Sequence, residues 1–251
     1  MLEATHLTKD FGNVVAVKDL NLKVGKELFV FLGPNGAGKT TTIKMMTGLL
    51  KPTTGSVKIY DYDLHQQPTE AKRLMGLVPE TPFLYQKLTG REFMYFMADL
   101  YQIDRAVSSK RLNDLIELFD LSNEADDMIQ SYSHGMKRKI AIGGALIHDP
   151  KVLFLDEPTI GLDPKSARNL KDVLVGLVER GVTVFMSTHI LEIAENMCDR
   201  VGIIHKGELI ACGNIEELRK QFQKKDYSLE DIFLDLTEGK ETKQVLKYLD
   251  T

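Results

Sequence analysis

The sequence predicts an α/β fold in which a helical insertion interrupts a mainly parallel sheet. Three runs, Leu28–Leu32, Val152–Leu155 and Val182–Met186, are apolar almost throughout. Such runs are typical of strands that are covered on both faces, as in a parallel sheet. From about Arg91 to Ile147 the pattern is helical, with little strand signal. Strands, a helical block and further strands therefore indicate an α/β core with an inserted α-helical subdomain.

Each expected element has its own local signal. Besides the three apolar runs, short β-type runs cover Ser56–Tyr60 and Val201–Ile204. Within the helical block, the expected helices are Glu92–Leu100, Lys110–Leu121 and His134–Leu146. Later helices are expected at four capping signals: Asp163 before Pro164, Gly181 at the end of that helix, Asn214, and Ser228 with Asp231.

The composition is that of an ordinary soluble protein and excludes disordered, collagen-like and disulfide-stapled chains. The 251 residues are 43% hydrophobic and 27% charged, with a net charge of −4. Proteins that clamp nucleic acid need a basic surplus or face, so we expect no nucleic-acid partner. The two isolated cysteines, Cys198 and Cys212, favour a reducing compartment. No apolar run reaches the roughly 18 residues of a membrane span, and no secretory signal is visible, so we expect a cytoplasmic chain.

The strongest motif is a glycine-rich loop between an expected strand and an expected helix. Gly33-Pro34-Asn35-Gly36-Ala37-Gly38-Lys39-Thr40 matches the pattern G-x-x-x-x-G-K-[ST]. The glycines let backbone N–H groups turn inward around phosphate oxygens, Lys39 can reach the β- and γ-phosphates, and the Thr40 hydroxyl suits Mg²⁺. The alternative is a glycine-rich turn with an incidental lysine. The position after Leu32 and before the helix-compatible run Thr41–Met46 favours a P-loop NTPase core.

A second motif joins an apolar strand to two acidic residues. Val152–Leu155 is followed directly by Asp156 and Glu157. In P-loop enzymes an Asp at the end of such a strand helps to hold Mg²⁺. The next Glu is placed to polarise an attacking water. By itself the pattern fits a solvated strand end equally well. It becomes a strong indication of a catalytic site only in combination with the phosphate loop.

A third motif, Ser131–Lys139, places a serine and a basic turn before the expected helix at His134–Leu146. Ser133 can cap this helix and leave free N–H groups aimed at an anion. From the residues alone, a plain capped helix with a basic first turn is the preferred interpretation. Only a family resemblance gives this motif a role with nucleotide.

Taken in order, the motifs resemble those of the ATP-binding cassette (ABC) ATPase family. The resemblance covers the chain from about Leu2 to Leu236 and is strongest to the ATP-binding subunits of bacterial ABC-2 type exporters. The segments that carry it are Gly33–Thr41, the loop at Glu80, Ser133–Lys137, Val152–Glu157, Gly161–Asp163, Ser187–His189 and Leu229–Phe233.

The resemblance implies an organisation for the whole chain. It implies a P-loop NTPase core with a mainly parallel sheet, an antiparallel β subdomain and an α-helical subdomain insertion. Residues 1–236 would form a single ABC ATPase domain, with 1–90 and 148–225 as the RecA-like core plus the β subdomain. Residues 91–147 would be the helical subdomain, and 226–251 a short C-terminal helical extension.

The resemblance also assigns nucleotide-binding roles. Phe11 stands where the family stacks an aromatic ring on adenine, although from the residues alone a core or turn phenylalanine is about as good an explanation. The other implied nucleotide-binding residues are Gly33, Pro34, Asn35, Gly36, Ala37, Gly38, Lys39, Thr40 and Thr41.

Catalytic and metal-binding roles follow from the same resemblance. Lys39, Glu157 and His189 are the implied catalytic residues, and Thr40, Asp156 and Glu80 the implied metal-binding residues. Glu80 stands where the family usually has glutamine, in a loop that senses Mg²⁺, the γ-phosphate and the membrane partner. A glutamate can accept a hydrogen bond but cannot donate one. The simpler alternative for Glu80 is a solvated loop acid.

Two further segments match parts of the family that act across a dimer. Ser133, His134, Gly135 and Met136 match the signature that binds the γ-phosphate of the opposite subunit's ATP. His134 replaces the usual first glycine, and Met136-Lys137 replaces the usual polar pair. His134 is either a side chain of the capping turn, the preferred interpretation, or a pH-sensitive neighbour of the nucleotide. Asp163 matches the loop that communicates across the dimer, although an N-cap role explains it equally well.

The function implied is an ATP-binding and ATP-hydrolysing subunit of an ABC transporter, and specifically of an exporter. The expected cofactors are ATP and Mg²⁺. The expected partners are a second ABC ATPase subunit, identical or different, and a separate transmembrane permease that holds the chain at the inner face of the cell membrane. The alternatives are an assembly ATPase with no membrane partner, such as one for iron–sulfur clusters, and a nucleic-acid ATPase of the same superfamily. The residues do not define the cargo.

Overall fold

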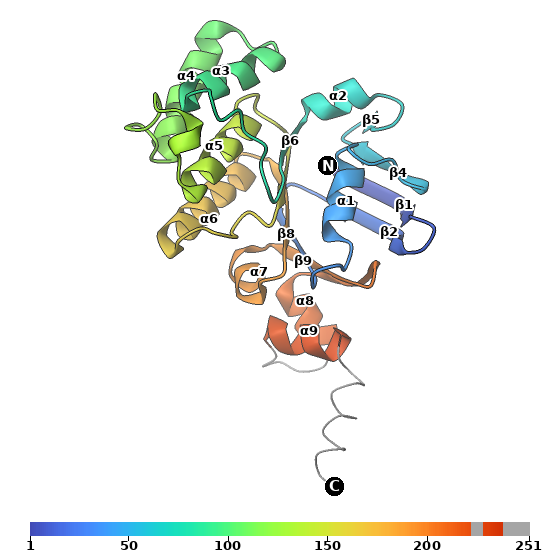
Figure 1. Ribbon diagram of the computed structural model, residues 1–251. Coiled ribbons are helices and arrows are strands. Elements are labelled where there is room, and N and C mark those ends of the chain that lie inside the picture. Colours follow the sequence, from blue (N-terminus) through green and yellow to red (C-terminus); the bar gives the residue numbers. More distant parts are fainter. Residues whose placement is uncertain (222–227, 238–251) are drawn as a thin grey trace.

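The computed structural model describes residues 1–221 and 228–237 (Figure 1). In chain order the elements are β1 (Leu2–Asp10), β2 (Val15–Val24), β3 (Leu28–Leu32), α1 (Lys39–Met46), β4 (Thr54–Ile59), β5 (Tyr62–Asp63), α2 (Pro68–Arg73), β6 (Met75–Val78), α3 (Gly90–Leu100), α4 (Arg105–Leu118), the 3₁₀ turn η1 (Ile129–Ser131), α5 (His134–Leu146), β7 (Val152–Asp156), α6 (Pro164–Glu179), β8 (Thr183–Thr188), α7 (Leu191–Met197), β9 (Arg200–His205), β10 (Glu208–Gly213), α8 (Ile215–Gln221) and α9 (Leu229–Thr237).

The central sheet has six strands in the order β10-β9-β3-β8-β7-β6. All neighbours in it are parallel except the antiparallel pair β10–β9. In register, Leu32 pairs with Thr188 and Asp156 pairs with Ser187, so β3, β7 and β8 end at one edge of the sheet. The phosphate loop, the two acidic residues and the segment at His189 therefore start from neighbouring points.

Alternate residues of β3 face two different parts of the core. Leu28, Val30 and Leu32 pack in a cluster with residues of α3 to α9. Phe29 and Phe31 pack instead with α1 and with the strands of the second sheet. This strand is buried along its whole length, which explains its continuous apolar run.

The second sheet is antiparallel, has the order β2-β1-β4-β5, and lies beside α1 (Figure 1). Its strands alternate between buried and exposed positions, and the alternation is interrupted by register shifts in β1. This is the antiparallel β subdomain implied by the family resemblance. The residue patterns predicted only β4 of this sheet, because irregular alternation gives a weak strand signal.

Helices α3, α4 and α5 pack against one another at one end of the molecule (Figure 1). The expected range of α5 is correct, whereas α3 starts at Gly90 because Thr89 and Glu92 form a reciprocal capping box. Helix α4 starts five residues earlier than expected because Asp104 caps it. The boundaries of this region at 91 and 147, and the other domain boundaries, remain predictions.

The capping signals late in the sequence are confirmed. Asp163 caps α6, and Gly181, with a φ of +85°, follows its end. Asn214 exchanges hydrogen bonds with Glu217 at α8. Ser228 and Asp231 do the same at α9. Most of the predicted extension over 226–251 lies outside the described residues, and within it the structure describes only 228–237.

Candidate active site

The glycine-rich loop takes a backbone shape that favours glycine at two positions and requires it at one of them. Gly36 and Gly38 have φ values of +79° and +109°. A methyl group on Gly38 would lie 2.4 Å from the Ala16 carbonyl oxygen, so no other side chain fits there. Gly38 is the N-cap of α1 and gives no side-chain cap. The first N–H groups of α1 are consequently left for an anion.

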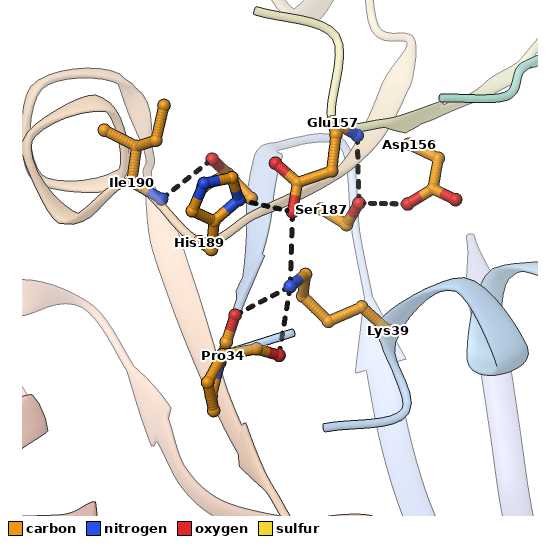
Figure 2. Close-up of polar contacts among 9 residues, drawn as sticks. Pro34, Lys39, Asp156, Glu157, Ser187, His189 and Ile190 are labelled. Atoms are coloured by element: carbon orange, nitrogen blue, oxygen red, sulfur yellow. Dashed lines mark hydrogen bonds and ion pairs between the residues drawn. The ribbon is translucent and has the colours of Figure 1, made fainter. Parts of the chain in front are cut away.

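Lys39 folds back over the loop in which it stands. Its side chain is buried, with 5% of the residue exposed. The Nζ atom donates to the carbonyl oxygens of Gly33 at 2.7 Å and of Pro34 at 3.3 Å. The same atom lies 3.2 Å from Glu157 Oε1 (Figure 2). A buried cation is thus held where a phosphate bound by the loop would find it.

Asp156 and Glu157 are fixed by Ser187 on the neighbouring strand. The Ser187 hydroxyl donates to Asp156 Oδ1 at 2.5 Å and accepts from the Glu157 N–H at 3.1 Å (Figure 2). That N–H also lies 3.2 Å from the Ser187 carbonyl oxygen. The sequence analysis assigned Ser187 no role beyond membership of the motif Ser187–His189. The role follows from the β7–β8 register, which places Ser187 opposite Asp156.

Glu157 combines several features of a reactive carboxylate. It is 4% exposed and has a φ of +49°. For a residue with a side chain this strain costs about 1–3 kcal/mol and is characteristic of functional sites. Its Oε1 lies 3.0 Å from His189 Nδ1 and is shared with Lys39. Its Oε2 is buried and has no hydrogen-bond partner. This oxygen therefore keeps its capacity to accept a proton or a hydrogen bond.

These groups surround one cavity of about 340 Å³. Its lining residues are Ala16, Pro34, Asn35, Gly36, Gly38, Lys39, Thr40, Thr41, Glu80, Glu157, Ile160 and His189. The structure thus brings together most of the predicted phosphate loop, the predicted catalytic residues, and Glu80. Ala16, in β2, and Ile160, in the turn after Glu157, were not predicted, because apolar side chains carry no chemical signal for such a site.

Three predicted residues contribute to the site without lining the cavity. Gly33 accepts the Lys39 hydrogen bond, and a methyl group on it would lie 2.4 Å from the Ile204 carbonyl oxygen. Ala37 is buried beneath the loop. Asp156 is buried and is hydrogen-bonded to Ser187.

Phe11 lies on the turn between β1 and β2 and is 56% exposed. Lys9 Nζ is 5.1 Å from the centroid of its ring. The exposed ring is available for stacking, which remains a prediction.

The oxygen groups at this edge fit a magnesium ion that is bound together with phosphates. Thr40 offers a hydroxyl and Asp156 a carboxylate, and both are hard oxygen ligands. Across residues 1–221 and 228–237, no group of three or more His, Cys, Asp or Glu side chains is arranged to hold a metal ion. Mg²⁺ is characteristically held by one or two protein groups, with phosphate oxygens and water completing its octahedron.

The signature residues lie outside the cavity. Ser133 caps α5 and accepts from the Met136 N–H at 3.2 Å, so the predicted capping role is confirmed. His134 is exposed, and its ring lies against the backbone of Gly161. A methyl group on Gly161 would be 2.6 Å from His134 Cδ2. A methyl group on Gly135 would lie 3.8 Å from Leu162 Cδ2. The signature turn thus packs against the loop that leads from Glu157 to α6.

Asp163 closes that loop as the N-cap of α6. It accepts from the Ser166 N–H at 3.0 Å and from the Ser166 hydroxyl at 2.7 Å. These hydrogen bonds lower the pKa of the Asp163 carboxyl. The capping role predicted from the sequence is therefore confirmed, while the role in dimer communication remains a prediction.

Residues 17–160 match the ABC transporter family model. The chain belongs to this family. It is 39% identical over 219 residues to the linearmycin resistance ATP-binding protein LnrL of Bacillus subtilis, covering 87% of this chain and 70% of that protein. It is 37% identical over 226 residues to the bacitracin transport ATP-binding protein BcrA of Bacillus licheniformis, covering 89% and 73%. A dimeric post-hydrolysis structure of the cassette MJ0796 with ADP and Pi has a TM-score of 0.78 at 26% identity, covering 86% and 99%.

Membership of the ABC family confirms the predicted resemblance, the fold class and the ATPase function. The protein is an ATP-binding, ATP-hydrolysing subunit of the ABC transporter family, and the alternative of an assembly ATPase is not supported. Cassettes of this family form dimers and work with transmembrane subunits. No helix among the described residues of this ABC ATPase has both the length and the apolar character that a membrane crossing requires.

Proposed function

We propose that this ABC ATPase drives an exporter by binding and hydrolysing Mg²⁺–ATP in the cavity at the ends of β3, β7 and β8. The observation that carries the proposal is the convergence of the phosphate loop, Lys39, Glu157 and His189 on this one cavity. Phosphoryl transfer to water needs positioned charges more than covalent chemistry, and these groups supply them.

Nucleotide binding uses the loop and the first turn of α1. The N–H groups of the loop surround the β-phosphate, and Lys39 exchanges part of its bonding to Gly33, Pro34 and Glu157 for phosphate oxygens. Phe11 stacks on the adenine ring. Thr40, Asp156 and Glu80 would hold Mg²⁺, and the ion would supply positive charge that neutralises the phosphates.

Hydrolysis uses the Glu157–His189 pair. The unpartnered Oε2 of Glu157 accepts the hydrogen bond of the attacking water and polarises it. The Oε1 atom fixes the imidazole of His189 through Nδ1, so the other ring nitrogen, Nε2, faces the γ-phosphate. Ser187 keeps the backbone of Glu157 and the carboxylate of Asp156 in register.

A second copy of the chain completes each site. Ser133 and Gly135 stand at the exposed N-terminal end of α5, away from the cavity of their own chain. They are therefore available to the γ-phosphate held by a partner. ATP binding would close the dimer, and hydrolysis followed by phosphate release would reopen it. Asp163 and its loop would carry information between the two sites.

Export with a separate transmembrane permease is the transport role that we propose. LnrL and BcrA are named for linearmycin resistance and bacitracin transport, both of which fit the removal of a compound from the cell. The permease would contact the Glu80 loop and the region of α3 to α5, and would hold the chain at the inner face of the membrane.

The site is tested with Glu157→Gln, which keeps the shape of the side chain but removes its basicity. We expect ATP binding to persist, turnover to fall by about a hundredfold to ten-thousandfold, and an ATP-bound dimer to accumulate in size-exclusion chromatography. Normal steady-state hydrolysis by this variant would contradict the role of Glu157.

The shared site is tested by mixing two inactive variants. Lys39→Ala damages only the phosphate loop, and Gly135→Asp places a negative charge where the partner's phosphate would lie. The fold tolerates the latter because the nearest neighbour of an added Cβ is 3.8 Å away and an acid is favourable in the first turn of a helix. Each variant alone should be inactive, whereas the mixture should regain activity from one intact site per mixed dimer. Gly176→Asp, in open space on α6, is the control. A mixture as inactive as its components would contradict the proposed dimer.

The export role is tested by co-purification. A tagged chain should bring down a protein with several membrane-spanning helices, and reconstituted vesicles should show ATP-driven movement of a compound away from the ATPase side. Movement in the opposite direction would overturn export while leaving the ATPase site intact.

A further inference from the structure

Arg138 is the one arginine in the described part of the chain that is almost completely buried. It stands on α5, one turn after the signature residues, and is 2% exposed. Its Nη1 atom donates to the Pro79 carbonyl oxygen at 2.9 Å, and its Nη2 atom donates to the Glu80 carbonyl oxygen at 2.7 Å. The Nε atom is buried and has no partner. A single side chain therefore ties α5 to the main chain of the loop at Glu80.

A contribution to folding stability does not explain the burial of Arg138. A buried guanidinium loses its hydration, and here no carboxylate is hydrogen-bonded to it in return. Burial lowers the pKa of Arg138, while the nearby charges of Glu80 and Asp156 act in the opposite direction. Replacing a buried ionic group by an apolar side chain of similar volume is often neutral or stabilising. A role in positioning explains the retained arginine better than a role in packing does.

Arg138 stands between two parts of the catalytic machinery. Its helix begins with the signature turn, which faces outward, whereas Glu80 lines the cavity of the same chain. Pro79 has a fixed φ and no N–H, so its main chain can be hydrogen-bonded only through its carbonyl group. Arg138 binds this carbonyl group and the next one, that of Glu80. Any shift of the first turns of α5 is therefore transmitted to Glu80 through two hydrogen bonds.

We propose that Arg138 is a positioning residue that couples the signature turn to Glu80, so that docking of α5 on a partner's nucleotide places Glu80 in the chain's own cavity. This inference rests on the proposed roles of the signature and of Glu80. It makes one buried side chain the link between two nucleotide sites, because each chain gives its signature to one site and its Glu80 to the other.

The test compares Arg138→Met, which keeps the volume but removes both hydrogen bonds, with Arg138→Lys, which can restore one of them. Arg111→Met is the matched control, because Arg111 also donates to a carbonyl oxygen, that of Ile147 at 3.2 Å, but outside the cavity. For each purified chain we measure the thermal midpoint, the affinity for a fluorescent ATP analogue, and the kcat and KM of ATP hydrolysis. Glu80→Ala and the double variant Arg138→Met/Glu80→Ala complete a cycle.

We expect Arg138→Met to lower kcat by about tenfold to a hundredfold, with analogue affinity, KM and thermal midpoint nearly unchanged. Arg138→Lys should recover part of the loss, and Arg111→Met should show none. The double variant should be no slower than the slower single variant, because both changes act through Glu80. A loss of kcat that follows a loss of thermal stability, or effects that multiply in the double variant, would overturn the inference while leaving the proposed function intact. Unchanged kcat in Glu80→Ala would overturn both the inference and the proposed role of Glu80, and Glu157→Gln reports separately on the proposed ATPase site.

Discussion

The phosphate loop and the signature turn both stand at the N-terminal end of a helix, α1 and α5, yet their surroundings are opposite. The phosphate loop is enclosed: Lys39 and Glu157 are buried, and residues of β2, of α1 and of the loops that follow β3, β6, β7 and β8 converge on the cavity beside them. The signature turn is exposed, and its neighbours are Gly161 and Leu162 of its own chain. This difference is what the proposed dimer requires, in which one chain would complete the first half of a site internally and present the second half to a partner.

In the comparison of these two helix ends, Lys39→Ala in the enclosed phosphate loop should have the strongest effect on ATP binding. Loss of the charge-assisted hydrogen bonds to phosphate, worth about 1.5–3 kcal/mol, should weaken ATP binding by roughly tenfold to a hundredfold. Titration with a fluorescent ATP analogue measures this. Lys44→Ala, an exposed lysine at the other end of α1, is the control and should bind normally. Unchanged affinity in Lys39→Ala would mean that the loop is not the phosphate site.

The next effect is expected for Ser187→Ala, which removes the hydroxyl that joins Asp156 to Glu157. Asp156 Oδ1 loses its buried donor, so the free energy of unfolding should fall by about 1–3 kcal/mol and turnover by about tenfold. Thr183→Val is a matched control on the same strand, because the Thr183 hydroxyl is buried without a partner. Urea denaturation and steady-state kinetics separate the two variants. Equal behaviour of the two would remove Ser187 from its positioning role.

The exposed half is tested by Gly161→Ala, whose methyl group would collide with the ring of His134. Backbone strain at a φ of +76° accounts for about 1–2 kcal/mol, and the collision adds to it. Gly12→Ala has similar strain, with a φ of +87°, but no neighbour within 4 Å. Urea denaturation should therefore show a larger loss for Gly161→Ala, and His134→Ala should remove the excess. If His134→Ala gives no relief, the contact between the signature turn and Gly161 is absent in solution.

The smallest effect on turnover is expected at His148, away from both halves. Its ring stacks on Tyr101 with centroids 3.6 Å apart, and burial lowers its pKa from 6.5 to about 4. Between pH 6.5 and pH 4, His148 is protonated in the unfolded chain but neutral in the folded chain. The contribution of this residue to the free energy of unfolding is therefore complete above pH 6.5 and is lost as the pH falls. The loss from this residue is about 2–3 kcal/mol near pH 4.

His148→Gln should flatten this part of the stability curve, measured by urea denaturation from pH 7 to pH 4, and should leave turnover at pH 7 unchanged. His65→Gln, at an exposed histidine, is the control and should follow the curve of the unchanged chain. A steep acid loss that persists in His148→Gln would assign the effect to other groups.

The secondary structure could be predicted where a strand is buried along its whole length or where a helix begins at a capping residue. Buried strands β3, β7 and β8 have continuous apolar runs, and α5 and α6 begin at the capping residues Ser133 and Asp163, so these elements were found correctly. Strands β1 and β2 are half exposed and interrupted by register shifts, which weakens their alternation. Strand β6 and helices α2 and α7 are short, and short segments give little periodicity to detect. Strand β10 is only partly buried and has no continuous apolar run.

The phosphate loop could be predicted from the sequence alone, because its glycines, Lys39 and Thr40 all lie within residues 33–40 and their conformation is local. Asp156 and Glu157 were predicted from their place at the end of an apolar strand, and His189 from the family resemblance. The tertiary structure decided how these groups meet: the register that sets Ser187 against Asp156, the contact of His134 with Gly161, and the hydrogen bonds of Arg138 to the Glu80 loop. These contacts join residues 27 to 58 positions apart in the chain. No local pattern encodes such distances, since packing and strand order alone bring the partners together.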